Sequence, residues 1–303
     1  MSQKTLLKAA VVIFSVFIST LSALAGELPA IVSTDWLEKN LKKDKLIILD
    51  VRKVEYYQEG HIPGAVNDFY RAWSFKKADL SAEVPDLDDL FELVGSVGIS
   101  PDNDVVVVGK MDTWQERVHI ARVACTLHYA GVANVALLDG GYIKWAREGR
   151  PVSKETVKPK PVKFKGQINR NIFVKKDYIL KNLDKVLLVD VREPAFFKGQ
   201  RKAEVATKAG RIPGAVNLPT SWIFEKDGTF KEKEVLESLA AGVVGKDKDR
   251  EIITYCDTGT CCPTWHFMLR EVLGYQRVYL YDGSIEEWTA DPGAPVQTNG
   301  DSK

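Results

Sequence analysis

The chain is poor in cysteine, methionine and histidine, and it carries almost no net charge. It has 4 cysteines, 3 methionines and 4 histidines in 303 residues, and its formal net charge is +1 at pH 7. A nearly neutral chain gives no electrostatic reason to expect a nucleic acid or an anionic membrane as a partner. No second pair of cysteines and no pair of histidines stands at the spacing of zinc ligands. We therefore predict no metal and no other cofactor.

The amino terminus has the pattern of a secretory signal peptide. Lys4 and Lys8 give a basic start, residues 9–24 are almost wholly apolar, and small residues lead up to Ala25. The apolar stretch is short for a membrane span, and no stop-transfer cluster of charges follows it. The sequence predicts cleavage after Ala25, so that residues 1–25 are lost, and a periplasmic or secreted chain without a membrane anchor.

Three of the four cysteines lie within one short stretch, from Cys256 to Cys262. Disulfides are usual in exported proteins, but such crowding favours reactive thiols over a scaffold of disulfides. The fourth cysteine, Cys125, lies in an apolar helical pattern, so we expect it to be a buried and unreactive part of the core.

Three sequence motifs occur twice, in the same order. Residues 46–52 recur as 186–192, residues 61–67 as 211–217, and residues 131–145 as 274–288. The shared order and similar spacing indicate two copies of one domain, with a short insertion in the second copy between its first two motifs. We predict domains at residues 26–150 and 169–298, joined by a linker at residues 151–168 that is rich in proline and lysine.

Each copy alternates apolar, β-prone runs with helical patterns. The runs are residues 46–51, 105–108 and 135–138 in the first copy and 186–191, 252–255 and 278–281 in the second. Residues 88–97 and 118–129 show a helical spacing of apolar side chains. This alternation predicts an α/β fold in which each domain has an open, mainly parallel sheet with helices on both faces. Sites in such sheets form beyond the carboxyl ends of strands, where Cys256 and, in the first copy, Gly109 stand.

The segment that begins at Cys256 has the features of an anion-binding loop between a strand and a helix. Tyr255 ends a strand, and Pro263 suits the first turn of a helix. Gly259 can adopt backbone angles that other residues avoid, so the loop can turn its N–H groups inward as a cradle. The predicted cradle consists of Cys256, Asp257, Thr258, Gly259, Thr260, Cys261 and Cys262. A thiol held at the start of a helix should have a lowered pKa and react as a thiolate.

Together these motifs resemble those of the rhodaneses. The shared features are the Asp-Val-Arg strand ends, both Ile-Pro-Gly-Ala-Val-Asn segments, the loop from Cys256 and the Tyr-Asp-Gly-Ser ending followed by a tryptophan. The resemblance implies two tandem rhodanese-like domains, arranged as in thiosulfate and mercaptopyruvate sulfurtransferases. It also implies that Cys256 takes sulfane sulfur from a donor, holds it as a persulfide and gives it to a thiophilic acceptor. Gly109 stands at the cysteine position of the first copy, which is therefore expected to be inactive.

Some positions that would bind the sulfur donor depart from the family pattern. Asp257 replaces the cationic residue that usually follows the cysteine, and its charge should repel a dianionic donor and raise the pKa of the thiol. Phe196 stands where two-domain members tend to carry a donor-binding arginine. Arg201 and Arg211, in the basic insertion, are candidates to replace that arginine, although a solvated basic loop fits equally well. Trp222 is a candidate wall of the substrate pocket or a core residue.

The loop ends in two cysteines where the family often has threonine or serine. Cys261 is a candidate resolving thiol that would form a disulfide with Cys256 or exchange persulfide sulfur with it. The alternative is that Cys261 or Cys262 only packs behind the loop. No arginine occurs from Cys256 to Met268, which argues against the related phosphatases that hold phosphate with a guanidinium group.

Three functions stay open at this point. The leading one is an exported sulfurtransferase that cycles Cys256 between thiol and persulfide, with a small sulfur donor such as thiosulfate and a thiol or cyanide acceptor. The second is a thiol–disulfide or chalcogen-handling redox protein that uses Cys256 with Cys261 and works with a redox protein partner. The third is a non-catalytic carrier that delivers persulfide sulfur to a partner.

Overall fold

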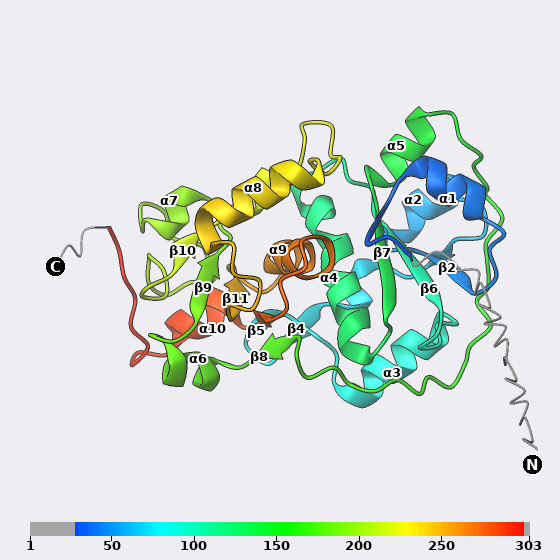
Figure 1. The fold of residues 1–303 in the computed structure, drawn as a ribbon. Coiled ribbons are helices and arrows are strands. Elements are labelled where there is room, and N and C mark those ends of the chain that lie inside the picture. Colours follow the sequence, from blue (N-terminus) through cyan, green and yellow to red (C-terminus); the bar gives the residue numbers. More distant parts are fainter. Residues whose placement is uncertain (1–27, 300–303) are drawn as a thin grey trace, which may run out of the picture.

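The computed structural model describes residues 28–299. The predicted signal peptide, residues 1–25, lies outside the described residues. The described chain forms two halves that lie side by side, each built around a five-stranded sheet (Figure 1). Every strand pair in these two sheets is parallel. The predicted α/β fold is confirmed.

The amino-terminal half has a sheet with the strand order β1-β7-β6-β2-β3. Its elements are β1 (Ile31–Val32), α1 (Thr34–Asn40), β2 (Leu46–Asp50), α2 (Val54–Glu59), β3 (Val66–Asn67), the 3-10 turn η1 (Tyr70–Ala72), β4 (Phe75–Lys77), β5 (Leu80–Glu83), α3 (Leu87–Ser96), β6 (Asp104–Val108), α4 (Trp114–Ala130), β7 (Asn134–Leu138) and α5 (Gly141–Arg147). The apolar runs predicted as strands fall on β2, β6 and β7, and the predicted helices fall on α3 and α4.

The carboxy-terminal half repeats this arrangement with the order β10-β9-β11-β12-β8, which is the same order read from the opposite edge. Its elements are β8 (Phe173–Val174), α6 (Lys176–Asn182), β9 (Leu187–Asp190), α7 (Pro194–Phe197), β10 (Val216–Asn217), the 3-10 turn η2 (Thr220–Ile223), α8 (Lys233–Val244), β11 (Ile252–Tyr255), α9 (Cys262–Phe267), the π-helical turn η3 (Met268–Val272), β12 (Val278–Tyr281) and α10 (Ser284–Ala290).

Alternation of side chains along the strands explains why helices cover both faces of each sheet. Val107 of β6 points into the core that includes α3 and α4, whereas Val108 packs with residues of α1, α2 and α5 on the other face. In the second half, Ile252 of β11 joins the first of these cores, while Ile253 packs with α6 and α10. One hydrophobic cluster is therefore shared by the two halves, and each half keeps a second cluster of its own.

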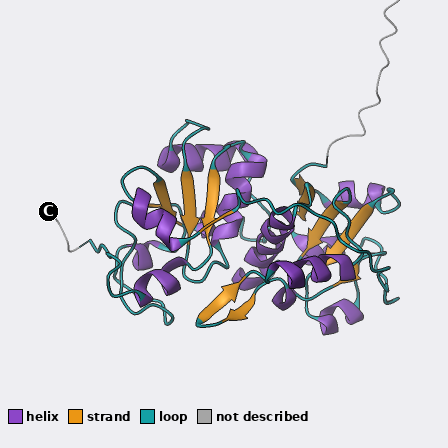
Figure 2. Ribbon diagram, turned by 90° about the horizontal axis from the view of Figure 1, so that it is seen from below, coloured by secondary structure: helices purple, strands orange, loops and turns teal. Residues whose placement is uncertain are grey.

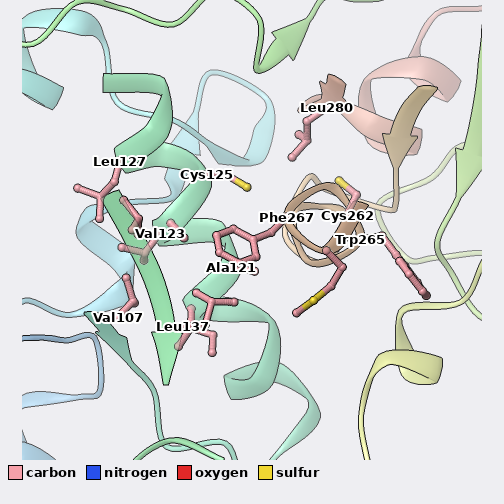
Figure 3. Packing of buried hydrophobic residues seen from close by; sticks show 14 of the residues in the cluster. Val107, Ala121, Val123, Cys125, Leu127, Leu137, Cys262, Trp265, Phe267 and Leu280 are labelled. Carbon is pink, nitrogen blue, oxygen red and sulfur yellow. The ribbon is translucent and has the colours of Figure 1, made fainter. Parts of the chain in front are cut away.

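The shared cluster is centred on the packing of α4 against α9. Figure 3 shows Phe267 pointing from α9 toward α4, where Ala121 and Val123 lie. Cys125 is fully buried at this interface, with its Sγ atom 3.6 Å from the carbonyl oxygen of Pro263. Burial raises the pKa of Cys125 far above its ordinary value. The structure thus places Cys125 in the core, as predicted.

Each half also extends a loop onto the other, and the two extensions are related by the duplication. In the amino-terminal half, β4 and β5 form an antiparallel hairpin that lies between the two sheets (Figure 2). Val84, just after this hairpin, donates its N–H group to Asp282 Oδ2 at 3.3 Å. In return, Phe230 of the loop after η2 donates its N–H group to Asp139 Oδ1 at 2.8 Å. Asp139 and Asp282 are equivalent residues that begin the repeated Asp-Gly turn. The turn of each half therefore accepts a hydrogen bond from the loop that the other half extends.

The predicted linker, residues 151–168, contains no helix or strand and runs along the amino-terminal half. Val162 donates its N–H group to the carbonyl oxygen of Gly95 at 2.9 Å. The buried ring of Phe164 packs edge-on against Phe91, with 5.3 Å between the ring centroids. The segment is therefore part of the packed structure.

None of the helices in residues 28–299 has both the length and the apolarity needed to cross a bilayer. Over the same residues, no group of three or more histidine, cysteine, aspartate or glutamate side chains is placed to hold a metal ion.

Candidate active site

Cys256 stands directly after β11, the middle strand of the second sheet. The last residue of this strand, Tyr255, pairs with Asp190 at the end of β9. The cysteine therefore lies beyond the carboxyl ends of the central strands, where sites form in parallel sheets. Its side chain is only 1% exposed. The loop that follows leads into α9, which begins at Cys262, one residue before Pro263.

Gly259 allows the loop to close tightly against the Asp-Gly turn of the same half. Its φ angle is +81°, in the left-handed region that favours glycine. A Cβ atom at this position would lie 2.5 Å from both the carbonyl oxygen and Oδ1 of Asp282. On either side of the glycine, the hydroxyl oxygens of Thr258 and Thr260 lie 3.1 Å apart. Glycine is thus required here for both its backbone angle and its lack of a side chain.

The loop converges on the sulfur of Cys256. Burial alone would raise the pKa of Cys256, but hydrogen bonds from the thiols and the backbone N–H groups of Cys261 and Cys262 lower it well below its ordinary value. The pKa of Cys261 is raised by its hydrogen bond to Cys256 and by burial, and that of Cys262 by burial and by its hydrogen bond to Cys256. One sulfur therefore carries the negative charge, and two neighbouring thiols donate to it.

The three sulfurs of this group differ in exposure. Cys256 and Cys262 are buried, whereas Cys261 is partly exposed, and all of them are free thiols. The backbone at Cys261 is held from η2, where Thr220 Oγ1 donates to its carbonyl oxygen at 3.5 Å. Of the three residues, Cys261 is thus the most exposed.

Asp257 is held by a buried arginine rather than left free beside the thiolate. The guanidinium group of Arg192 donates to Asp190 Oδ2 at 2.6 Å and to Asp257 Oδ1 at 3.3 Å. Burial and the negative charge of Cys256 raise the pKa of Asp257 to about 6, against the opposing effect of Arg192. The sequence predicts that Asp257 raises the pKa of the thiol, but the pKa of Cys256 is lowered overall. The repulsion between the two charges appears instead in the raised pKa of the Asp257 carboxyl group.

Ser284, which the sequence analysis did not single out, supports the backbone of Cys256 from the start of α10. Its hydroxyl group accepts a hydrogen bond from the Cys256 N–H group at 3.1 Å and donates to the carbonyl oxygen of Tyr281 at 2.9 Å. Ser284 has a φ angle of +48°, a conformation that costs a non-glycine residue roughly 1–2 kcal/mol. The equivalent residue of the first copy is Gly141, with a φ angle of +55°. The difference between Gly141 in the first copy and Ser284 in the second was the only sequence signal that could have pointed to Ser284.

The corresponding loop of the first half begins at Gly109, directly after β6. A Cβ atom on Gly109 would lie 2.6 Å from Cγ2 of Ile120. The next residue, Lys110, forms an ion pair with Asp112 at 2.6 Å. The first copy thus lacks the thiol, and it also lacks the room that a cysteine side chain needs.

The candidate substrate-binding residues of the second half lie in three different settings. The guanidinium group of Arg201 lies over the ring of Phe196, 4.8 Å from its centroid, beside the position where the family arginine is missing. Arg211 donates to Asn299 Oδ1 at 2.8 Å, which ties the end of the described chain to this half. Trp222 lies on η2 and is 39% exposed. The substrate-binding roles of Arg201, Arg211 and Trp222 stay predictions.

The fold and the site define a class of protein: two duplicated α/β domains, of which the second presents a low-pKa cysteine on a loop between strand and helix. The model of the Rhodanese-like domain family matches residues 33–148 and 175–291. The chain belongs to the rhodanese family and contains two tandem domains of this kind.

Relatives that match most of the chain have names that refer to the carriage or transfer of sulfur. The sulfur carrier protein TtuD of Thermus thermophilus is 34% identical over 281 residues, which cover 88% of this chain and 95% of that protein. A protein of Haloferax volcanii named "Putative thiosulfate sulfurtransferase" is 35% identical over 283 residues, which cover 88% of this chain and 96% of that protein. Among solved structures, EanB in complex with ergothioneine matches with a TM-score of 0.77 and 25% identity, over 89% of this chain and 70% of that chain.

Proposed function

We propose that the protein is a sulfurtransferase that carries sulfane sulfur as a persulfide on Cys256. With thiosulfate as donor, the Cys256 thiolate attacks the outer sulfur, the S–S bond of thiosulfate breaks, and sulfite leaves with the bonding electron pair. A thiolate or cyanide acceptor then attacks the outer sulfur of the persulfide and leaves as a persulfide or as thiocyanate. This second step restores the Cys256 thiolate, so the cycle needs no cofactor.

The observation that carries this proposal is the position of Cys256, which is buried directly after β11 at the start of the loop, and whose pKa the neighbouring Cys261 and Cys262 lower well below its ordinary value. Donors arranged in advance around a thiolate are also suited to the terminal sulfur anion of a persulfide. A solved structure of EanB, 25% identical to this chain, holds a cysteine persulfide together with ergothioneine. We propose that Cys256 takes the same persulfide form.

Steady-state turnover with a panel of donors tests the proposal. Thiosulfate, mercaptopyruvate and polysulfide would each be supplied with cyanide as acceptor, and the formation of thiocyanate would be followed. Saturable turnover with any of these donors supports an enzyme. Loading of one sulfur without turnover would indicate a carrier, and the absence of both loading and turnover would contradict the proposal.

Asp257 is expected to weaken the binding of a dianionic donor. We predict that Asp257→Asn lowers the KM for thiosulfate roughly fivefold, equivalent to about 1 kcal/mol of charge repulsion in a partly exposed site. In the unmodified protein the same KM should fall as the pH decreases through about 6, the pKa of Asp257, because protonation removes the repelling charge. Kinetics at a series of pH values, with mercaptopyruvate, whose single carboxylate stays ionised around pH 6, as the comparison donor, would measure this. A KM for thiosulfate that stays constant across that pKa would contradict the assigned role of Asp257.

A second candidate function uses Cys261 as a resolving thiol, and the hydrogen bond from its thiol to Cys256 favours it. The sulfur of Cys261 would attack the inner sulfur of the persulfide, form a disulfide with Cys256 and release hydrogen sulfide. An external dithiol would then have to reduce the disulfide.

For this function we predict that the loaded protein, kept without an acceptor, releases sulfide and forms the disulfide. Cys261→Ser should keep its persulfide under the same conditions, because no thiol can resolve it. Cys262→Ser is the matched control, since Cys262 also donates to Cys256 but is buried, and it should still release sulfide. Sulfide assays and intact mass measure both outcomes. A loaded protein that keeps its persulfide with all cysteines present would rule this function out.

We also propose that the chain is exported and loses residues 1–25. The basic, apolar and small-residue segments before Gly26 support this. Mass spectrometry of the protein from fractionated cells should find a chain that begins at Gly26 outside the cytoplasm. A cytoplasmic chain that keeps Met1 would contradict export.

A further inference from the structure

Arg122, a residue of the first half, ends against the active-site loop of the second half. It lies on α4 and its side chain is fully buried. Its Nη1 atom donates to the carbonyl oxygen of Gly259 at 3.1 Å and to Asp282 Oδ1, while Nη2 donates to Asp282 Oδ2 at 3.1 Å. Nη2 also donates to the carbonyl oxygen of Ala82 in β5 at 3.0 Å. One guanidinium group thus joins α4, the hairpin, the loop of Cys256 and the Asp-Gly turn.

The hydrogen bond from Arg122 to the carbonyl oxygen of Gly259 can affect the reactivity of Cys256, because both residues belong to the same loop. In a loop that curls around an anion, N–H groups point inward and carbonyl groups point outward. Here the backbone N–H groups of Cys261 and Cys262 lower the pKa of Cys256, and the carbonyl of Gly259 accepts a hydrogen bond from Arg122 on the other side of the loop. By binding the carbonyl group of Gly259, which points away from the sulfur of Cys256, Arg122 stabilises the loop conformation in which the N–H groups point toward that sulfur.

The same hairpin reaches the loop by a second route. Ser81 donates its N–H group and its hydroxyl group to the carboxylate of Glu286 at 2.9 and 2.5 Å. The N–H group of Glu286 in turn donates to the carbonyl oxygen of Asp257 at 2.9 Å. Contacts that originate in the first half therefore restrain the loop of Cys256 near two of its carbonyl groups.

We propose that Arg122 is a positioning residue for sulfur transfer, and that the first half, although it has no nucleophile, completes the active site by holding the curl of the Cys256 loop. The proposal rests on the proposed function of Cys256. The ionisable groups around the guanidinium are Asp282 in the turn, Glu83 in β5, Cys262 in α9 and Tyr70 in η1. Without Arg122 the buried carboxylate of Asp282 would be unpaired near the thiolate of Cys256, and its charge would disfavour the thiolate.

Arg117 provides a matched control for this proposal. It lies on the same helix, and its guanidinium group donates across the same interface to the carbonyl oxygens of Glu225 and Lys226 at 3.4 and 3.1 Å. Arg122→Met, Arg122→Lys and Arg117→Met would be compared by thermal melting and by steady-state kinetics. The pH dependence of Cys256 alkylation by iodoacetamide, followed by peptide mass, would be measured for each variant.

Arg122→Met should lower kcat roughly 100-fold with little change in KM, because the donors around the sulfur are displaced. In this variant, the pH at which iodoacetamide alkylates Cys256 half-maximally should increase. Arg122→Lys keeps the charge and should recover part of both properties, whereas Arg117→Met should match the unmodified protein. A folded Arg122→Met variant with unchanged kcat and alkylation would overturn the proposal.

If Arg122→Met does not fold, the double variant Arg122→Met with Asp282→Asn removes the unpaired carboxylate, and Arg122→Lys keeps the charge. Either variant with an unchanged kcat and alkylation profile would overturn the proposal. Alkylation needs no sulfur donor, so the two proposals can fail separately. A shifted alkylation profile in a protein that transfers no sulfur would refute the proposed function and leave the positioning role in place. Normal transfer in every Arg122 variant would refute the positioning role alone.

Discussion

Cys256→Ser is expected to abolish sulfur transfer with every donor while leaving the fold intact. A serine hydroxyl group does not ionise near neutral pH, and its oxygen cannot hold sulfane sulfur as a persulfide. The exchange of sulfur for oxygen changes the volume of the side chain little, so the melting temperature should change by a few degrees at most. Thiocyanate formation and thermal melting of the purified variant measure the two effects.

Cys125→Ala is the control for that experiment, because Cys125 is another fully buried thiol. It lies at the packing of α4 against α9 (Figure 3), and its substitution should leave turnover in place. A folded Cys125→Ala variant that loses turnover, or a Cys256→Ser variant that keeps it, would contradict the assignment of the nucleophile.

Gly259→Ala is also expected to have a large effect, on both turnover and stability. The left-handed backbone at this position costs an alanine about 1 kcal/mol, and the added methyl group would lie 2.5 Å from two oxygens of Asp282. Shifting the surrounding atoms to relieve such a contact costs about 1–3 kcal/mol more of the free energy of unfolding. The loop must shift to relieve it, and this moves the N–H groups that hold the sulfur. We predict a loss of kcat of roughly 100-fold together with a lower melting temperature.

Gly214→Ala separates the effect of the backbone angle from that of the contact. Gly214 has a φ angle of +77°, close to the +81° of Gly259, but a Cβ atom there would meet nothing within 4 Å. This variant should lose about 1 kcal/mol of stability and keep its turnover. Equal losses of kcat in the two glycine variants would show that the contact with Asp282 does not matter.

Much of the fold was predictable because its signals are local. Apolar runs mark β2, β6, β7, β11 and β12, and β11 and β12 have the bounds that the sequence predicts. The loop of Cys256 was also recognisable, since a strand end, a central glycine and a proline in the first helical turn lie in one segment. Helix α9 begins at Cys262, so Pro263 lies in its first turn, as the sequence predicts.

The contacts between the halves were not predictable in the same way, because they depend on packing between distant segments. Arg122 lies within the apolar pattern of residues 118–129, and a charged residue inside such a pattern was the only local signal of its role. Ser81 lies in a hairpin for which the sequence analysis made no prediction, and its partner Glu286 is more than 200 residues away. The sequence could thus predict Cys256 as the nucleophile, but not the groups that hold its loop.

These contacts show that equivalent turns of the two copies have different partners. The first copy has no thiol at Gly109 but has the Asp-Gly turn, where Asp139 accepts from Phe230 of the second half. The second copy uses the equivalent turn, at Asp282, to bind Arg122 beside the loop of Cys256. The two equivalent turns therefore serve different purposes: one holds the halves together, and the other also supports the loop of Cys256.

The intact mass of the protein after incubation with thiosulfate or polysulfide tests the central claim most directly. We predict a gain of one sulfur atom in the unmodified protein, its loss when cyanide is added, and no gain in Cys256→Ser. No gain of sulfur from any donor, or a gain that persists in Cys256→Ser, would contradict the persulfide of Cys256.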